Sequence, residues 1–264
     1  MTNNFQFLTF EVKAKVAHVT LNRPEVHNAL HPGMLEELHA AFESIAASSR
    51  DDLRAVVMRG AGKSFCAGAD VNWMRESLAY TEEENVADAL RMGRTFRAID
   101  TCPVPVIACV HGAALGGGVG LAAVSDIVVA EEGAAWGLSE VKLGIAPAVI
   151  SPYVLRKIGR GHARALFLTG ERFATERAVQ IGLAHHIVKA DELEQTVAHL
   201  TAEILNSSPH GIERAKHLIA VVPDLEPDEA MQFTAETIAA LRVSEQGQEG
   251  LRAFLEKRKP GWAG

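Results

Sequence analysis

Short apolar runs that end in glycine-containing loops, and that alternate with helical periods, constrain this chain most strongly. Leu53–Met58 and Val104–Val110 have the length and composition of buried strands, and they lead into Arg59–Gly62 and His111–Gly112. Between them, Glu82–Ile99 carries apolar residues at helical spacing. Strands that alternate with covering helices are typical of an α/β fold. The pattern therefore predicts an α/β architecture for this part of the chain.

The two ends of the chain differ in pattern. Phe7–Val12 and Val16–Leu21 are β-rich and lie three residues apart, which predicts an antiparallel hairpin. Beyond about Pro147, strand-like runs nearly vanish and helical periods dominate, from Val154–Ile158 to Glu249–Lys257. No proline- or serine-rich linker separates the two regions. We therefore expect one structural unit whose helical end packs on a neighbouring subunit.

Composition narrows the classes of protein that this chain can be. A chain of 264 residues can bury a sizeable core without disulfides or a structural metal. Its 26 Lys and Arg against 33 Asp and Glu give a net charge of -7, which argues against nucleic acid as the main partner. Three cysteines without a CxxC pattern predict free thiols in a reducing compartment. With no signal-peptide pattern and no apolar stretch of about 20 residues, we expect a cytoplasmic protein and no membrane partner.

Two loops of small residues follow predicted strands. Phe65–Asp70 would let a ligand approach the main chain closely, although a tight turn into a helix with Asp70 near its start explains the segment equally well. His111–Gly118 precedes a predicted helix, whose amide-bearing end is electropositive. It lacks both the dinucleotide fingerprint and the P-loop lysine. Amides from two such loops could form an oxyanion hole, and glycine-mediated helix packing is the alternative.

Glu140 is the one carboxylate in the mostly apolar run Trp136–Ile145. If it is buried, its pKa should be raised, as a general base near neutral pH requires. Taken alone, a structural role is favoured, because a surface glutamate in the first turn of a helix is the commoner explanation. His185 and His186 have no third ligand at suitable spacing, so we expect a strand there and no metal site. Cys66 has no adjacent histidine in sequence and is interpreted as a small buried residue.

Six segments together resemble the crotonase (enoyl-CoA hydratase/isomerase) family. They are Leu21–Pro24 with Asn28–Leu30, Phe65–Asp70, Gly112–Gly118, Glu140–Gly144, Leu168–Arg172 and Phe254–Pro260. The resemblance spans nearly the whole chain in order. It implies an α/β fold, a crotonase-like spiral of ββα units over residues 1–195, with a C-terminal helical trimerisation region over residues 196–264. It also implies a homotrimer or homohexamer.

The resemblance further implies an acyl-CoA thioester as the ligand, with no separate cofactor because CoA is part of the substrate. The thioester oxygen would be held by the amides of Ala69 and Gly117, with Glu140 as acid and base. Adenine and pantetheine would lie along residues 26–30 and 67–71. The expected substrate-binding residues are Val26, His27, Ala29, Leu30, Ala67, Gly68, Ala69, Asp70, Val71, Gly116, Gly117 and Gly120.

Gly120 departs from the family pattern, because the family's two hydratase carboxylates fall by position on Gly120 and Glu140. A single glutamate is similar to what enoyl-CoA isomerases of the family use to move a proton from C2 to C4. The segment Glu140–Tyr153 instead resembles hydratases of branched-chain catabolism, including methylglutaconyl-CoA hydratases. We expect a hydratase for a short or branched 2-enoyl-CoA that works through Glu140 and a differently placed acid or an ordered water.

Other functions stay open at this point. Isomerisation by Glu140 is the first alternative. If the missing second carboxylate limits hydration, Gly120→Glu should raise hydration relative to isomerisation by restoring it. A non-catalytic acyl-CoA binder is the second, and it gives Glu140 no role. An RNA-associated protein is the third, and the net charge of -7 argues against it.

Overall fold

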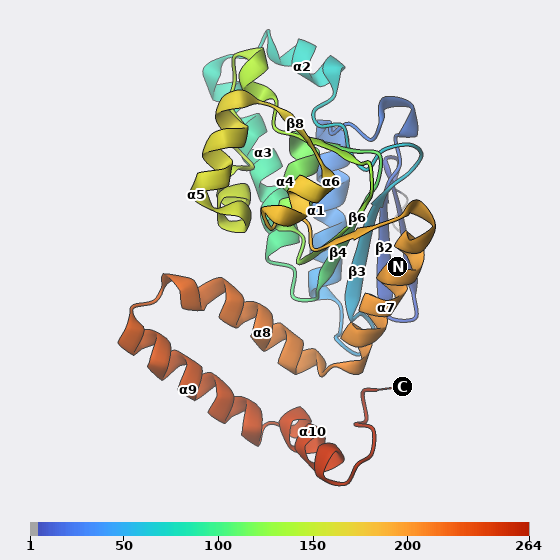
Figure 1. The fold of residues 1–264 in the computed structure, drawn as a ribbon, viewed down its shortest axis with the longest axis vertical. Helices are drawn as coiled ribbons and strands as arrows, with labels where there is room; N and C mark the ends of the chain where they lie inside the picture. Colours follow the sequence, from blue (N-terminus) through green and yellow to red (C-terminus); the bar gives the residue numbers. More distant parts are fainter. Residues whose placement is uncertain (1–4, 264) are drawn as a thin grey trace.

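Two sheets and the helices around them form the main body of the molecule, which the computed structural model describes for residues 5–263 (Figure 1). The strands are β1 Leu8–Lys13, β2 Val16–Leu21, β3 Ala55–Gly60, β4 Val106–Val110, β5 Ala113–Leu115, β6 Ile127–Glu131, β7 Ala135–Gly137, β8 Arg172–Ala174 and β9 His186–Val188. The α-helices are α1 Pro32–Ala47, α2 Val71–Ser77, α3 Glu82–Asp100, α4 Gly117–Val124, α5 Ser151–Thr169, α6 Thr175–Gln180, α7 Leu193–Asn206, α8 Pro209–Val221, α9 Pro227–Val243 and α10 Glu245–Leu255. Short 3₁₀ helices are η1 Pro24–Val26, η2 Glu140–Leu143, η3 Ala190–Glu192 and η4 Val222–Asp224.

The larger sheet has six strands in the order β1-β2-β3-β4-β6-β9. The first two strands form the antiparallel hairpin expected from the sequence, and Ala14 and Lys15 take positive φ angles at its turn. Every later pairing in this sheet is parallel. The parallel strands are joined by connections that include helices, so the alternation of apolar runs and helical periods is confirmed as an α/β fold.

The smaller sheet is built from strands of three residues in the order β5-β7-β8. Each of β5 and β7 follows a strand of the larger sheet after a short connection. Single parallel bridges, Cys66 with Ala114 and Leu30 with Ala69, continue the same arrangement in the earlier part of the chain. The chain therefore repeats a unit of long strand, short strand or bridge, and helix, as the expected spiral of ββα units requires.

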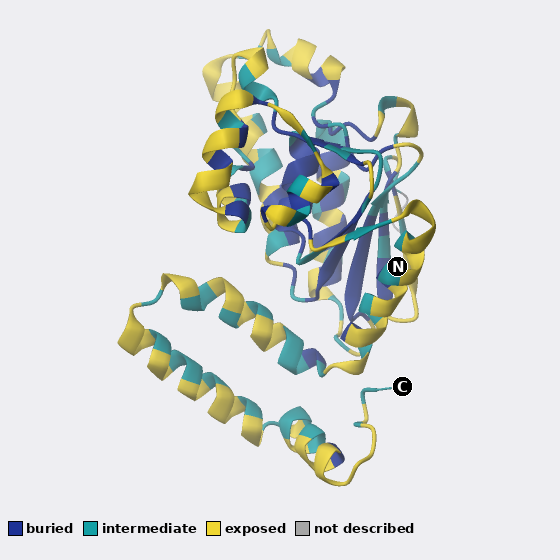
Figure 2. Ribbon diagram, viewed as in Figure 1, coloured by how far each residue is buried: buried dark blue, intermediate teal, exposed yellow. Residues whose placement is uncertain are grey.

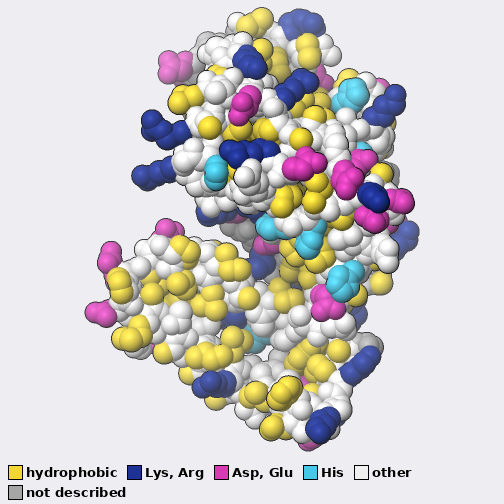
Figure 3. Space-filling view, viewed as in Figure 1, with side chains coloured by type: hydrophobic (Ala, Val, Ile, Leu, Met, Phe, Trp, Pro, Cys, Tyr) yellow, Lys and Arg dark blue, Asp and Glu magenta, His cyan; other side chains and the backbone are white. Residues whose placement is uncertain are grey.

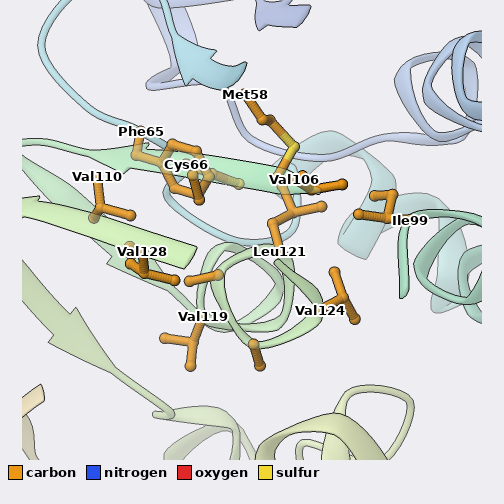
Figure 4. Close-up of a cluster of buried hydrophobic side chains, with 14 of the residues drawn as sticks. Met58, Phe65, Cys66, Ile99, Val106, Val110, Val119, Leu121, Val124 and Val128 are labelled. Carbon is orange, nitrogen blue, oxygen red and sulfur yellow. The ribbon is translucent and has the colours of Figure 1, made fainter. Parts of the chain in front are cut away.

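Helix α4 lies at the centre of the core. All eight of its residues are buried, and Figure 4 shows its apolar side chains among those of neighbouring strands and helices. Val119, Leu121 and Val124 on this helix lie close to side chains such as Met58, Val106 and Val128. Because the helix is enclosed on all sides, its first residue, Gly117, has a fixed position in the molecule.

Helices α8, α9 and α10 form an arm that extends away from the sheets (Figure 1). Figure 2 shows mostly exposed and half-buried residues along it. Helix α9 has no buried residue, and α8 and α10 have one each, Pro209 and Ala253. Helix α7 instead packs against β3, β4 and β6, and it runs across the expected boundary between residues 195 and 196. The division of the chain at that boundary stays a prediction.

The expected loss of strands beyond Pro147 is only partly correct. The segment around His186 is a strand, as expected, whereas β8 was not indicated by the sequence pattern. Strand β5 was interpreted as part of a loop, and no strand was expected at β7. Three residues are too few to show a period of two, which is the physical reason that these strands were missed. Among the described residues, no helix is long and apolar enough to cross a membrane.

Candidate active site

The two loops of small residues meet at the smaller sheet. Leu30 forms a parallel bridge with Ala69, and the side chain of Leu30 also lies against Gly117. A Cβ atom placed on Gly117 would be 2.7 Å from Leu30 Cδ1, and one placed on Gly116 would be 3.9 Å from the Cα atom of Gly68. Residues from three parts of the sequence that were expected to form one site are therefore neighbours in space.

The amide of Ala69 is left free by the bridge that holds it. Leu30 N donates to Gly68 O at 2.7 Å, and Asp70 N donates to Leu30 O at 2.8 Å. Both bonds are made by the neighbours of Ala69, so its own N–H points away from Leu30. Within residues 5–263, the amides of Ala69 and Gly117 donate no hydrogen bond to another protein group. The two expected oxyanion donors are thus available to a ligand.

Gly116 turns the chain sharply into α4. Its φ of 48° and ψ of -113° suit glycine, and its amide donates to Gly137 O at 2.9 Å. That bond joins the ends of β5 and β7, so it brings the loop after β7 beside the start of α4. A Cβ atom at residue 116 would lie 3.2 Å from Glu140 Oε1. The carboxylate therefore lies next to the free amide end of α4.

Glu140 begins η2 and is half-buried. Burial raises the pKa of its carboxyl group above the ordinary value, while a hydrogen bond with its own backbone opposes the shift. Its Oε2 atom is buried and has no hydrogen-bond partner among the described residues. A buried carboxylate oxygen without a partner is costly, so it indicates a place where a ligand or water belongs. The sequence predicted a raised pKa only on condition of burial, and the shift of this half-buried group is in that direction.

Residues 26–30 and 67–71 lie side by side. Ala67 N donates to His27 O at 3.0 Å, and the His27 ring lies 3.0 Å from Ser64 Oγ through Nδ1. Val26 is half-buried, whereas His27 is exposed. Val71, at the start of α2, is also exposed. The two segments thus form one continuous edge that includes surface residues on both sides.

The side chain of Asp70 is fully occupied within the protein. Oδ2 accepts from Arg23 Nη2 at 2.7 Å, and Oδ1 accepts from Asn72 N at 2.7 Å at the start of α2. Burial alone would raise the pKa of Asp70, but the hydrogen bonds from Arg23 and the α2 amides outweigh it and hold the pKa below its usual value. Asp70 is the N-cap of α2, as expected from its place after the loop.

Gly120 is enclosed by the core on the side where a side chain would project. A Cβ atom at this residue would lie 2.4 Å from Ile150 Cγ2 and 3.0 Å from Phe96 Cε1. The volume is therefore filled by apolar atoms and has no room for a carboxylate. The expectation that Gly120→Glu simply restores a second carboxylate is wrong for this reason. Ile150 was not predicted as a site residue, because no local pattern shows which distant side chain fills the space.

Burial and hydrogen bonding explain two other residues that the sequence analysis considered, Cys66 and His185. Burial raises the pKa of the Cys66 thiol to about 12, which fits a small buried residue with no nucleophilic role. His185 Nδ1 accepts from Val128 N at 2.9 Å, so this ring satisfies a strand amide. Within residues 5–263, no group of three or more His, Cys, Asp or Glu side chains could hold a metal ion.

Comparisons with known proteins agree with this geometry. Residues 11–264 match the family model described as enoyl-CoA hydratase/isomerase. The chain is 34% identical to the short-chain-enoyl-CoA hydratase of Clostridium acetobutylicum, with 94% of each chain covered. It is 32% identical to the crotonyl-CoA hydratase of Syntrophomonas wolfei, with 97% of each covered. This chain therefore belongs to the enoyl-CoA hydratase/isomerase family, a family of enzymes that act on acyl-CoA thioesters.

The fold agrees as well. The structure is similar to that of an enoyl-CoA hydratase from Shewanella pealeana, with a TM-score of 0.94 and 39% identity over 98% of this chain and 97% of that one. The resemblance to the crotonase family, and the α/β fold implied by it, are thus confirmed. The roles of individual site residues stay predictions.

Proposed function

We propose that this protein is an enoyl-CoA hydratase for a short or branched 2-enoyl-CoA thioester. The observation that carries the proposal is the buried, unpartnered Oε2 atom of Glu140, beside the start of α4. A thioester oxygen bound by the amides of Ala69 and Gly117 would develop negative charge as C3 is attacked. Main-chain donors stabilise such charge well because they are rigid and already oriented.

Glu140 supplies the proton chemistry in this proposal. Its carboxylate takes a proton from a water molecule while the water oxygen bonds to C3, and the negative charge moves to the thioester oxygen. The charge then returns to C2, which takes a proton from the protonated Glu140, either directly or through an ordered water that Glu140 reprotonates. Atoms and charge balance without oxidation or reduction, so the reaction calls for no separate cofactor, and CoA is part of the substrate.

Isomerisation is the second candidate function, and the packing at Gly120 favours it. With Ile150 in the volume beside Gly120, Glu140 is the single carboxylate assigned to the reaction. One carboxylate is sufficient to remove a proton from C2 and return it to C4. The two reactions share the oxyanion donors and differ in whether water is added to the substrate.

Turnover of a panel of thioesters by the wild-type protein and Glu140→Gln tests the proposal. The panel contains trans-2-enoyl-CoA, 3-enoyl-CoA and methylglutaconyl-CoA, and the products separate hydration from isomerisation. We expect hydration to be fastest and Glu140→Gln to lower kcat roughly 10²–10⁴-fold with little change in binding. Glu132→Gln, at an exposed glutamate in the connection between β6 and β7, is the control and should retain activity.

Three results of that experiment would reject parts of the proposal. Preferred turnover of 3-enoyl-CoA without addition of water would establish the isomerase instead. Near wild-type turnover by Glu140→Gln on every thioester would remove Glu140 from the mechanism. Binding of thioesters without any turnover would indicate an acyl-CoA binding protein.

We also propose that the arm formed by α8, α9 and α10 is covered by further copies of this chain, in a homotrimer or homohexamer. Figure 3 shows hydrophobic side chains gathered over the arm. Large apolar side chains on it are strongly exposed, including Ile219 at 75%, Val243 at 79% and Phe254 at 82%. Exposed apolar surface of this kind is typical of an interface. A monomeric mass by light scattering at micromolar concentration would contradict the proposal.

A cytoplasmic location, with no nucleic-acid partner, stays a prediction that rests on the net charge and the cysteine pattern. Localisation by a fluorescent fusion and salt-dependent retention on RNA would test its two parts separately.

A further inference from the structure

Arg23 connects two segments of the candidate site, residues 26–30 and residues 67–71. It lies just before η1, and its guanidinium group donates to two acceptors on different segments. Nη1 donates to Ala29 O at 2.7 Å, and Nη2 donates to Asp70 Oδ2 at 2.7 Å. The guanidinium also lies over the ring of Phe7, 5.9 Å from its centroid. The planar, forked shape of the guanidinium group allows one side chain to hold both segments at fixed directions.

The ion pair is shielded from solvent. The Arg23 side chain is 14% exposed and that of Asp70 is 5% exposed. An ion pair in such surroundings holds its geometry more firmly than a surface pair, because water competes less for its hydrogen bonds. Removal of one partner leaves the other charge without compensation, which the surrounding structure must accommodate. The conformations of residues 26–30 and 67–71 therefore depend on this pair.

Asp70 links the ion pair to the bridge around Ala69. One carboxylate oxygen binds Arg23, the other caps α2, and the amide of Asp70 donates to Leu30 O at 2.8 Å. Ala29, whose carbonyl oxygen binds Arg23, directly precedes Leu30. Arg23 and Asp70 thus fix both strands of the single bridge. The loop itself contributes little side-chain packing, since residues 67–69 are Ala, Gly and Ala.

We propose that the Arg23–Asp70 pair is a positioning device that fixes the direction of the Ala69 amide toward the thioester oxygen. Neither side chain acts on the substrate, so both are positioning residues. The inference rests on the proposed function, because it assumes that the Ala69 amide binds a thioester oxygen. It adds that the direction of this hydrogen-bond donor is set by an ion pair that does not touch the reacting atoms.

A chromophoric substrate analogue separates this role from a general contribution to stability. In 4-dimethylaminocinnamoyl-CoA, light absorption moves electron density from the amine to the thioester oxygen. Hydrogen bonds to that oxygen therefore shift the absorption maximum to longer wavelength. The shift of the bound analogue reports how well the oxyanion donors are aimed, and it needs no turnover and no action of Glu140.

Two variants break the pair in different ways. Asp70→Asn retains a side-chain acceptor for the α2 cap, since asparagine is also a good N-cap, but it loses the charge facing Arg23. Arg23→Lys retains the charge but cannot bind Ala29 O and Asp70 in the same forked geometry. Asp100→Asn is the matched control, because it breaks the ion pair of Asp100 with Arg156, which joins α3 to α5. Thermal unfolding of each variant, and its binding of the analogue, give the folded and bound fractions.

We expect the wild-type protein and Asp100→Asn to show the full red shift. Asp70→Asn and Arg23→Lys should bind the analogue within about threefold of wild type but lose most of the shift per bound molecule. Their kcat should fall about 10²-fold, as for loss or misplacement of one oxyanion donor, with KM changed much less. If Asp70→Asn does not fold, Arg23→Lys alone decides the outcome.

The possible failures are distinguishable. A full shift per bound molecule and a wild-type kcat in a folded variant would overturn the positioning role while leaving the proposed function intact. A fall in kcat that only matches the loss of folded protein would overturn it as well. Wild-type protein that binds the analogue without any shift, or does not bind it, would refute the proposed oxyanion site, and the inference would fall with it.

Discussion

The packing around Gly120 predicts that one added methyl group changes stability with opposite sign in two backgrounds. Gly120→Ala places a Cβ atom 2.4 Å from Ile150 Cγ2 and 3.1 Å from Ile150 Cβ. Because the branch point itself is close, rotation of the Ile150 side chain cannot relieve the contact. Overpacking of a core costs about 1–3 kcal/mol, and the upper end applies here. Replacement of glycine by alanine inside a helix stabilises the folded state by about 1 kcal/mol through helix propensity. Gly120→Ala should therefore destabilise the protein by about 2 kcal/mol.

Removal of the obstructing side chain should reverse the sign. Ile150→Ala alone should cost about 2–5 kcal/mol, because it leaves a cavity beside Phe96. In that background the contact at 2.4 Å is gone, and only Phe96 Cε1 at 3.0 Å and the Cβ of residue 150 at 3.1 Å must give way by a few tenths of an ångström, which the cavity permits. Most of the helix gain of about 1 kcal/mol should therefore remain. The two substitutions should thus be coupled by about 3 kcal/mol. Such a coupling is well above the few tenths expected for independent sites.

Urea unfolding of the wild-type protein, the two single variants and the double variant measures this coupling free energy. Each is unfolded at one fixed protein concentration, since assembly would make stability depend on concentration. Gly161→Ala is the matched control, because nothing lies within 4 Å of a Cβ atom at this α5 residue. It should be neutral or stabilising in both backgrounds. Additive effects within about 0.5 kcal/mol, or a destabilising Gly120→Ala in the Ile150→Ala background, would refute the packing argument.

Further predictions follow from burial and bonding. The acid limb of kcat against pH should lie above 4.5, because burial raises the pKa of Glu140 and its basic form is lost as pH falls through that value; a limb at or below 4.5 contradicts this. Asn28→Ala should cost about 3 kcal/mol in urea unfolding, because it removes one buried and one partly buried hydrogen bond to carbonyl groups and places alanine at a φ of 55°. Native thiols should react with iodoacetamide at pH 8 far more slowly than unfolded ones, and equal rates would disprove their burial. Burial raises their pKa values to about 12 for Cys66 and about 11 for Cys102 and Cys109.

Elements with several apolar residues in a regular period could be predicted from the sequence. The hairpin of β1 and β2 and the helix at Glu82–Asp100 were found close to their actual bounds. Strands β5, β7 and β8 could not, because three residues define no period and their pairing partners lie far away in sequence. Tertiary contact, and not local preference, decides that such segments are strands.

Some features of the candidate site could likewise be predicted from the sequence, and others could not. The small residues near Ala69 and Gly117 predicted places where a ligand can approach the main chain, since that property depends on residue size alone. The direction of each amide could not be predicted, because it depends on a single bridge and on an ion pair between residues 47 positions apart. The raised pKa of Glu140 followed only on condition of burial, which the sequence could not establish.

The glycine at residue 120 and the lone carboxylate at residue 140 belong to one electrostatic arrangement. Two carboxylates that share a dry site raise each other's pKa, so one of them tends to hold a proton. With Ile150 and Phe96 packed against residue 120, no second carboxylate stands there, and burial is the cause that raises the pKa of Glu140. A proton removed by Glu140 then has no second carboxylate at residue 120 to receive it. In both proposed reactions the simplest course is therefore delivery of that proton to the substrate, at C2 in hydration and at C4 in isomerisation.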